Sequence, residues 1–183
     1  MLKPEGHRPN DNDAPTGPTV TGIARVDKRT KDLAKRIEPG EIAVIDHVDL
    51  DTVATESLIA AGVAAVVNAS ACISGRYPNA GPLLLPTAGV PVVDGVGADV
   101  MTAINDGDQI VVEGGRVLRD GREVASGTRQ DMDSFETVLK EARSNMGDEL
   151  QRFAENTLNY IQREGHLLVD DPDIPDIPVD FQG

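Results

Sequence analysis

Residues 40–97 read GEIAVIDHVDLDTVATESLIAAGVAAVVNASACISGRYPNAGPLLLPTAGVPVVDGVG and give the clearest indication of the fold. Three short apolar runs lie in this segment: Ile42–Ile45, Val63–Val67 and Val90–Val93. Each run ends in polar or glycine-containing residues. Short apolar runs that alternate with helical patterns are typical of a parallel α/β sheet, and ligand sites gather at the carboxyl ends of such strands. We therefore expect the polar residues after the runs to lie along one edge of one sheet.

The flanking segments extend this pattern. We expect a first strand at Thr19–Asp27, a short helix at Arg29–Ile37, a short or irregular helix from Pro82 to Ala88 and another helix at Gly97–Asn105. A further helix follows the first apolar run, capped by Asp49 or Asp51. Its inward-facing residues are predicted to be Val53, Leu58, Ile59 and Ala60.

After residue 108 the sequence pattern changes to short strands separated by glycine-containing turns, which predicts a β-meander. Short strands are expected at Gln109–Glu113, Arg116–Arg119 and Arg122–Ser126, because Gly114-Gly115 and Asp120-Gly121 suit tight hairpin turns. The α/β unit would close at about Gly127.

From Gln130 the pattern is helical for about 35 residues, or ~53 Å if unbroken. The apolar seam has coiled-coil-like spacing with one irregular step: Phe135, Leu139, Ala142, Met146, Leu150, Phe153, Thr157 and Ile161. Gly147 is the weakest point and would divide the helix if the segment formed a helical hairpin. Two interpretations stay open. The seam packs back on the α/β unit, or it dimerises or receives a partner helix.

The chain of 183 residues has a formal net charge of −14 and a pI near 4.5, which argues against duplex DNA or an anionic membrane surface as the main partner. No run is long enough to span a membrane and no signal peptide is apparent, so we expect a cytoplasmic protein without direct membrane insertion. The expected organisation is a disordered arm (1–19), an α/β domain (20–128), a long helical segment (129–168) and an acidic Pro-rich linker or tail (169–183), after which a further domain is expected.

Candidate ligand-binding residues follow the apolar runs: Asp46, His47, Asp49, Asn68, Ser74, Gly75, Arg76, Asn79 and Asp94. The loop Ser74–Pro82 combines Ser, Gly, Arg and Asn before a helix, a set that can hold a nucleotide or phosphate group. In the alternative interpretation, Arg76 pairs with Asp46 or Asp94 and the loop is only structural.

Other chemistry has weaker support in the sequence. The spacing in Asp46–Asp51 matches no metal motif, so a polar rim with a helix cap is the better interpretation there. Neither GxxxxGK[ST] nor a strand-following GxGxxG occurs. Ser74 has no evident histidine to activate it other than His47, if the two loops meet. We therefore predict no catalytic residue, no metal and no cofactor beyond such a nucleotide or phosphate ligand.

The order of AAGVAAVV, a Ser-containing loop, AGVPVVDGVG and INDGDQIVVEGGRV resembles the swivelling phosphohistidine domain of phosphoenolpyruvate-utilising enzymes over roughly Pro39–Val117. This resemblance implies a β/β/α layered unit with parallel strands. In that family a Thr-Ser-His carries the phosphoryl group on its histidine. The matching positions here are Ile73-Ser74-Gly75, so the resemblance argues against phosphotransfer.

A resemblance to the SteA family of actinobacterial cytokinetic ring proteins covers nearly the whole chain. The residues that carry it are GIARVDKRTKDLAKRIEPGEIAVIDHVDLD, SGRYPNAGP, GVPVVDGVG and FAENTLNYIQRE. In that family this part precedes a thiamine-pyrophosphokinase-like domain and a membrane-anchoring region, neither of which occurs in these residues. The resemblance implies a role in cell division, with recruitment to the septal membrane and a membrane-anchored coiled-coil partner, SteB.

Two functional hypotheses result. The first is a non-catalytic cell-division module that forms a homodimer and binds a SteB-like partner through its long helix. The second is a nucleotide- or phosphate-binding domain of a thiamine-pyrophosphokinase-like enzyme, with its ligand at the strand ends. The resemblance implies ATP binding and kinase activity only for the half of the family's proteins that these residues do not include.

Overall fold

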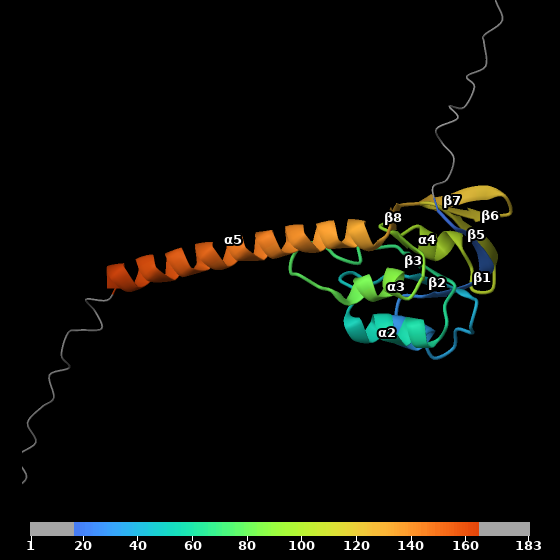
Figure 1. Ribbon diagram of the computed structural model, residues 1–183, viewed down its shortest axis with the longest axis horizontal. Coiled ribbons are helices and arrows are strands. Elements are labelled where there is room, and N and C mark those ends of the chain that lie inside the picture. The colour runs from blue at the N-terminus through green and yellow to red at the C-terminus, as the bar shows by residue number, and fades with distance from the viewer. Residues whose placement is uncertain (1–16, 165–183) are drawn as a thin grey trace, which may run out of the picture. The chain divides into compact units, whose positions relative to one another are not determined.

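The computed structural model describes residues 17–164 (Figure 1). The expected disordered arm and the acidic tail lie almost wholly outside these residues. The elements in chain order are β1 (Thr19–Asp27), α1 (Thr30–Leu33), β2 (Ile42–Ile45), α2 (Thr52–Ala60), β3 (Ala65–Asn68), the 3-10 helix η1 (Gly81–Leu83), α3 (Leu84–Thr87), β4 (Val92–Asp94), α4 (Val100–Ala103), β5 (Gln109–Glu113), β6 (Arg116–Arg119), β7 (Arg122–Ser126), β8 (Thr128–Gln130) and α5 (Met132–Glu164).

The strands form one eight-stranded sheet in the order β7-β6-β5-β1-β2-β3-β4-β8. Strands β1 to β4 run parallel, while β5 to β7 form the antiparallel meander. The predicted α/β class with parallel strands, a meander and a long helix is therefore confirmed. The bounds predicted for β1, β2, β5, β6 and β7 agree with the structure, because apolar runs and turn dipeptides mark both ends of these strands.

Strand β1 joins the two parts of the sheet. Its first half, Thr19–Ile23, pairs antiparallel with β5, and its second half, Ala24–Asp27, pairs parallel with β2. One continuous strand thus links the meander to the parallel strands, which explains why β1 is longer than its parallel neighbours.

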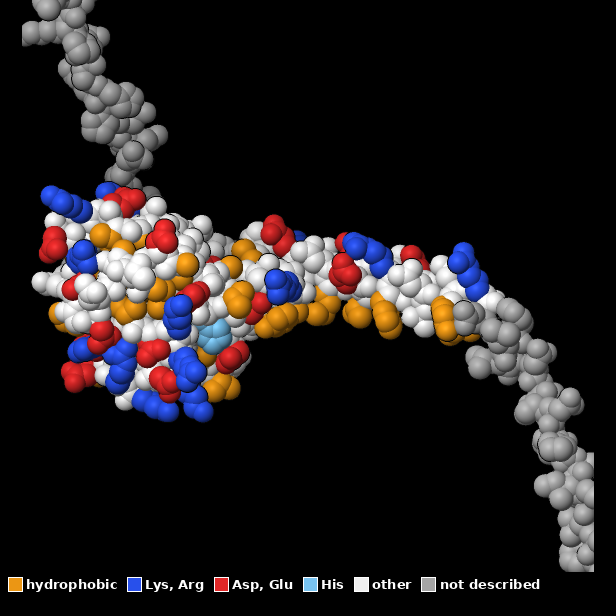
Figure 2. Space-filling model, turned by 180° about the vertical axis from the view of Figure 1, so that it is seen from behind, with side chains coloured by type: hydrophobic (Ala, Val, Ile, Leu, Met, Phe, Trp, Pro, Cys, Tyr) orange, Lys and Arg blue, Asp and Glu red, His pale blue; other side chains and the backbone are white. Residues whose placement is uncertain are grey.

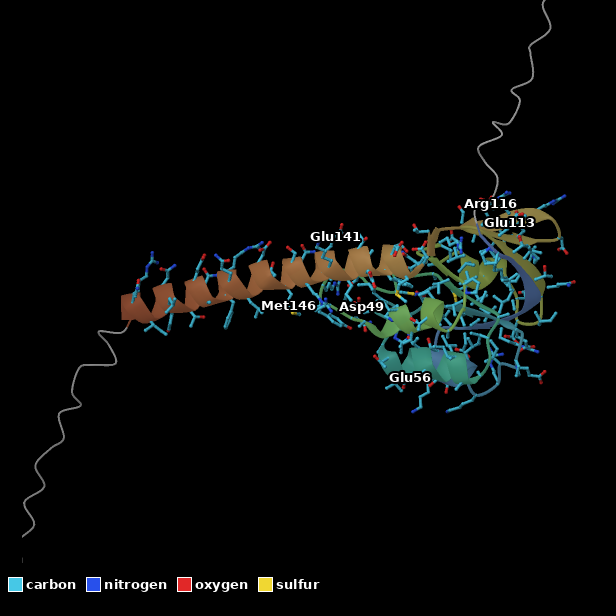
Figure 3. All side chains as sticks on the ribbon, viewed as in Figure 1. Asp49, Glu56, Glu113, Arg116, Glu141 and Met146 are labelled. Carbon is cyan, nitrogen blue, oxygen red and sulfur yellow. The ribbon has the colours of Figure 1, made fainter. Side chains whose placement is uncertain are left out.

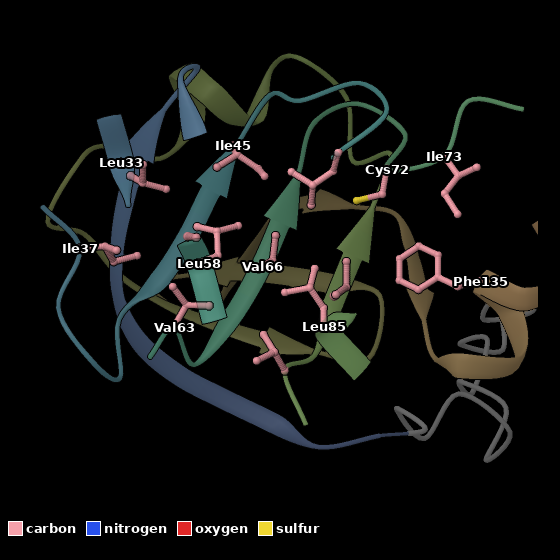
Figure 4. Packing of buried hydrophobic residues seen from close by; sticks show 14 of the residues in the cluster. Leu33, Ile37, Ile45, Leu58, Val63, Val66, Cys72, Ile73, Leu85 and Phe135 are labelled. Carbon is pink, nitrogen blue, oxygen red and sulfur yellow. The ribbon is translucent and has the colours of Figure 1, made fainter. Parts of the chain in front are cut away.

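The parallel strands are buried on both faces, as their uninterrupted apolar runs require. Along β2, Ala43 and Ile45 point into one core cluster with residues of α1, α2 and α3, while Ile42 and Val44 point into a second cluster with α4 and the meander. Figure 1 shows α2 and α3 on one side of the strands and α4 on the other. Figure 4 shows the first cluster, where Phe135 of α5 packs near Ile73.

Three local predictions are wrong. Strand β8 was not expected, because its three residues Thr-Arg-Gln carry no apolar pattern; it pairs antiparallel with β4 at an edge of the sheet. Val53 and Ala60 of α2 were expected to face inward but are exposed, Val53 at 73%. Leu58 is fully buried and holds the helix against the sheet, with Ile59 partly buried beside it.

Helix α5 is a single helix of 33 residues, and Gly147 lies within it without a break, so the alternative of a helical hairpin is wrong. Its start is fixed by reciprocal hydrogen bonds: Ser134 N donates to Asp131 Oδ1 at 2.9 Å, and Asp131 N donates to Ser134 Oγ at 2.8 Å. This arrangement satisfies backbone donors that the first helical turn leaves open. The chain divides into two compact units within α5, after Asn145. The first half of the helix belongs to the α/β unit, and Met146–Glu164 belongs to the second.

Candidate functional site

The carboxyl ends of the parallel strands lie at one edge of the sheet, as the sequence predicted. Strands β1, β2, β3 and β4 are hydrogen-bonded in that order, so the residues that follow Asp27, Ile45, Asn68 and Asp94 are neighbours. Most of the candidate ligand-binding residues are located there. Their hydrogen bonds show which of them hold the protein's own loops in place.

Asn68 joins the ends of β2 and β3. Its Oδ1 accepts from His47 N at 3.0 Å, and its Nδ2 donates to His47 O at 2.8 Å and contacts Cys72 Sγ at 3.2 Å. The side chain is fully buried. Because both ends of the amide are used within the protein, Asn68 is a structural clamp rather than a ligand contact.

Asp94 and Cys72 form a second buried pair. Cys72 N donates to Asp94 Oδ1 at 2.8 Å, which ties the loop after β3 to the end of β4. Burial raises the pKa of the Cys72 thiol well above its usual range, and the charge of Asp94 adds to this effect. Burial also raises the pKa of Asp94. A thiol held protonated in this way is a poor nucleophile, so Cys72 is a core residue.

Asp49 anchors the loop that begins at Ser74. The Asp49 carboxylate accepts from Ser74 N at 2.7 Å and from Ser74 Oγ at 2.8 Å. Asp49 itself has φ of 54°, a conformation that Asp tolerates better than most residues, and it lies in the loop after β2 (Figure 3). The cap of α2 is Asp51, whose Oδ1 accepts from Ala54 N at 2.8 Å.

His47 and Ser74 do not meet. The imidazole Nδ1 of His47 is hydrogen-bonded to Thr30 Oγ1 at 2.8 Å, while the Ser74 hydroxyl donates to Asp49. A nucleophile and its base must be within hydrogen-bond reach of each other, so these two residues do not form a hydrolytic pair.

The loop Ser74–Pro82 is held largely by its own polar residues. Asn79 Nδ2 donates to Leu50 O at 2.7 Å, and Gly81 N donates to Asn79 Oδ1 at 3.1 Å. Asp46 accepts from Ser70 Oγ at 2.6 Å. The Arg76 guanidinium makes no hydrogen bond or ion pair with another described residue. The expected pairing of Arg76 with Asp46 or Asp94 is therefore absent, and Gly75 has φ of 84°, as the turn requires.

A basic depression at this edge lies elsewhere, beside the ends of β1 and β2. It has a volume of about 640 Å³ and is lined by Lys28, Arg29, Thr30, Lys31, Asp32, Lys35, Asp46, His47 and Val48. We call it the basic cleft. A neighbouring depression shares Lys31 and His47 and continues to Asp51 and Asn79. Figure 2 shows Lys and Arg side chains gathered around a histidine on this face.

Four cationic side chains line the basic cleft in a chain whose formal net charge is −14. Asp32 accepts from Lys35 at 3.4 Å and lies 4.0 Å from Arg29, so these two cations are partly neutralised. Sequence reasoning placed the anion site at Arg76 and missed this cluster. The sequence signal for this cluster is the run Lys28-Arg29-Thr30-Lys31 directly after the first strand.

The seam of α5 divides at the same place as the two units. Phe135, Leu139 and Ala142 were candidates for a partner interface, but they are buried in the core cluster under the sheet, with exposures of 1%, 6% and 0%. These three residues are therefore corrected from interface to core. They belong to the same buried cluster as Ile73 and Leu85.

The second half of α5 is exposed where the first half is buried. Its large apolar side chains are highly exposed: Leu150 (63%), Phe153 (70%), Leu158 (59%), Tyr160 (63%) and Ile161 (52%). Helical periodicity places most of them on one face, together with Met146 and Thr157. Figure 2 shows a row of hydrophobic side chains along one edge of the helix. We call residues 146, 150, 153, 157, 160 and 161 the exposed seam.

No helix within residues 17–164 is long and apolar enough to cross a membrane. In the same range, no group of three or more His, Cys, Asp and Glu side chains is arranged to hold a metal ion.

Comparison with known proteins gives little further guidance. No protein-family model and no curated protein sequence matches the chain. Among solved structures, the chain is similar to the 3-isopropylmalate dehydratase leuD of Methanocaldococcus jannaschii, with 12% identity and a TM-score of 0.42 over 76% of this chain and 99% of that one. It is also similar to RraAS2, of the RNase ES inhibitor RraA family, from Streptomyces coelicolor, with 13% identity and a TM-score of 0.41 over 76% of this chain and 77% of that one. A third similarity, at 14% identity and a TM-score of 0.38, is to a cellulase from gut-associated microbes and covers 73% of this chain and 68% of that one. Similarities this weak carry no functional argument.

Proposed function

We propose that this chain is a non-catalytic module of a bacterial cell-division protein, which self-associates through the second half of α5 and binds a membrane-anchored coiled-coil partner. The exposed seam is the observation that carries the proposal. Five large apolar side chains more than half exposed lie between Leu150 and Ile161. Burying such side chains gains about 1.5–3 kcal/mol each, so a helix of this kind gains from a partner.

The occupant of the exposed seam in this proposal is a second copy of the same helix. The sequence resemblance to SteA proteins adds the cell-division context and a SteB-like coiled-coil protein, which would bring the module to the septal membrane. The hydrogen bonds at the strand ends also support a non-catalytic role, because Asn68, Ser74 and Asp49 are engaged in holding loops together.

Sedimentation of the purified chain over a range of concentrations tests self-association. We expect a monomer–dimer equilibrium, and the double variant Leu150→Asp/Phe153→Asp should be monomeric, with the melting temperature that the wild type shows when it is dilute enough to have dissociated. The matched control is Asn159→Asp, on the opposite face of the same helix, which should leave the dimer intact. A monomeric wild-type chain at several hundred micromolar would overturn the proposal.

Binding of the second partner is measured separately. A purified SteB-like coiled-coil segment, titrated into the wild-type chain by calorimetry, should bind, and Asn159→Asp should not alter the affinity. If no heat of binding appears while the homodimer forms normally, the partner part of the proposal fails and self-association stands.

A second candidate function is the binding of an anionic small molecule, such as a nucleotide or phosphate, in the basic cleft. The observation in its favour is the gathering of Lys28, Arg29, Lys31 and Lys35 around one depression at the carboxyl ends of β1 and β2. Anions are attracted to clefts lined by positive charge, and the effect weakens as salt rises. No catalytic step is part of this candidate.

Thermal-shift measurements with pyrophosphate and ATP distinguish the two possible anion sites. If the basic cleft binds the anion, Lys28→Ala/Lys31→Ala should abolish the stabilisation, while Arg76→Ala should leave it unchanged. Loss in Arg76→Ala alone would place the site in the Ser74–Pro82 loop. No shift with either anion would remove this candidate.

A further inference from the structure

We propose that the exposed seam pairs with a second copy of itself in an antiparallel orientation, with the two-fold axis at the level of Glu155. This inference rests on the proposed self-association and specifies its geometry. The side-chain volumes along the seam and its flanking charges both favour that arrangement over a parallel pair.

The exposed seam has its own heptad register. Met146, Leu150, Phe153, Thr157 and Tyr160 occupy successive d and a positions of a 3.5-residue repeat, beginning with Met146 at d. In the longer pattern two four-residue steps follow each other at Met146, where the two units divide. The buried half of the seam thus belongs to the core of the α/β unit, and the exposed half forms a separate repeat.

Antiparallel pairing gives layers of matched volume. In that orientation an a residue faces a d residue, so Leu150 lies opposite Tyr160 of the partner subunit and Phe153 lies opposite Thr157 of the partner subunit. Each layer then combines one aromatic ring with one smaller side chain. A parallel pair would instead place two Phe153 rings in one layer and two Thr157 side chains in the next, which leaves alternately crowded and poorly filled layers.

Thr157 fits this arrangement because its polar group is already satisfied. Its Oγ1 donates to Phe153 O of the same helix at 2.8 Å. The hydroxyl therefore needs no partner across the interface, and the methyl group is left to contact a facing aromatic ring.

The charges that flank the seam distinguish the two orientations. Glu149 and Arg163 both occupy g positions, and in an antiparallel pair a g residue faces a g residue of the other helix. Glu149 then lies opposite Arg163 of the partner subunit, and the two-fold axis repeats this pair. In a parallel pair g faces e, so Glu149 would lie opposite Ala154 and Arg163 would gain no acidic neighbour.

With the axis at Glu155, Met146 lies opposite position 164 of the partner, so the register spans residues 146–164, the part of the second unit that the structure describes. None of the pairing requires Phe135, Leu139 or Ala142, which are buried within their own chain.

Disulfide trapping tests the orientation directly. Asn156 is at the g position nearest the two-fold axis, so Asn156→Cys should form an intermolecular disulfide under mild oxidation in an antiparallel dimer. Thr157→Cys is the matched control: its two copies face each other at an a position only in a parallel dimer, and are displaced by about 6 Å along the axis in the antiparallel one. The wild-type chain is a further control, because its single Cys72 is fully buried.

A charge exchange gives an independent readout without cysteines. Glu149→Arg and Arg163→Glu should each raise the dimer dissociation constant about tenfold at low salt, because each substitution creates two like-charge contacts. The double variant Glu149→Arg/Arg163→Glu should restore the wild-type value, and the differences should shrink at high salt.

The outcomes separate this inference from the proposal on which it rests. Trapping through Asn156→Cys with rescue in the double variant supports the antiparallel pair. Trapping through Thr157→Cys and not Asn156→Cys would overturn the orientation and leave self-association intact. A monomeric wild-type chain would remove both.

Discussion

The buried amide of Asn68 hydrogen-bonds both the N–H and the C=O of His47, and so continues the pairing of β2 and β3 by one step beyond the strand ladder. A side chain replaces a neighbouring backbone segment at the point where the two strands separate. The loops at the strand ends therefore start from a fixed position.

The first prediction concerns this clamp. Asn68→Ala should lower the free energy of unfolding by about 3 kcal/mol, because two backbone groups of His47 lose their buried partner. Denaturant unfolding would measure the loss. Asn79→Ala also removes two hydrogen bonds, but in a loop that is only partly buried, and should cost about 1 kcal/mol, so equal losses in the two variants would contradict the clamp.

The second prediction concerns the loop anchor at Asp49. Asp49→Ala should lower the free energy of unfolding by about 2 kcal/mol. The substitution removes two hydrogen bonds from Ser74, and it places at a positive φ an alanine, which tolerates that conformation less well than aspartate does. Asp49→Asn retains an acceptor for Ser74 N and the tolerance of positive φ, and should cost less than half as much. Thermal unfolding of the two variants side by side would settle the order.

The third prediction is a pH dependence from Glu41. Hydrogen bonds from Arg25 hold the pKa of Glu41 below its ordinary value of 4.5. A lowered pKa adds stability above the unfolded value, and this stability is lost as pH falls through the folded one. The melting temperature of wild type should therefore exceed that of Glu41→Gln at pH 7, and the gap should narrow towards pH 3. A gap that widened in acid would contradict this sign.

The fourth prediction is a pH dependence from Asp94, whose contribution to stability changes with pH in the opposite direction to that of Glu41. Burial raises its pKa above the ordinary 3.8, so the folded state holds the proton more tightly than the unfolded chain does. The contribution of Asp94 to stability should then fall as pH rises through that range. Asp94→Asn keeps an acceptor for Cys72 N, and its melting temperature relative to wild type should increase from pH 3 to pH 7. A constant difference would show that the carboxyl titrates alike in both states.

The last prediction separates the two halves of α5. Leu139→Ala should lower the free energy of unfolding by about 2–4 kcal/mol, because Leu139 is buried in the core. Leu150→Ala should leave the stability of the monomer within about 0.5 kcal/mol of wild type, since Leu150 is 63% exposed. Dilute samples, in which any dimer has dissociated, are needed for the comparison. A large loss in Leu150→Ala under those conditions would mean that the seam packs within its own chain.

The sequence predicts the strands correctly where the local pattern and the tertiary structure agree. The apolar runs of β2 and the glycine turns of the meander predicted those strands because burial and turn chemistry act on neighbouring residues. Strand β8 could not be predicted in this way, since a short polar edge strand exists only because β4 offers it an unpaired edge. Val53 shows the same limitation, because helical spacing alone does not say which side of a short helix meets the sheet.

The candidate site was predicted in position but not in its chemistry. The gathering of polar residues at one edge followed from parallel strands, and the structure agrees. The conformation of the loops determines which of those residues hydrogen-bond within the protein. Asn68 and Asp49 bond backbone groups of neighbouring loops, while Lys28 and Lys31 line a cleft. The seam of α5 was a single pattern in the sequence, and only the packing of Phe135 showed that its first half is core.

The two-sided pairing of β1 also constrains the order in which the chain can fold during synthesis. Thr19, at the start of the strand, pairs with Glu113 at the end of β5, whereas Ala24 pairs with Ile42 a short distance along the chain. The parallel half of β1 can find its partner soon after it leaves the ribosome, but the other half must wait until β5 has emerged. The amino-terminal end of the strand therefore stays an open sheet edge until β5 has been synthesised, and a nascent chain stalled before residue 109 would expose it.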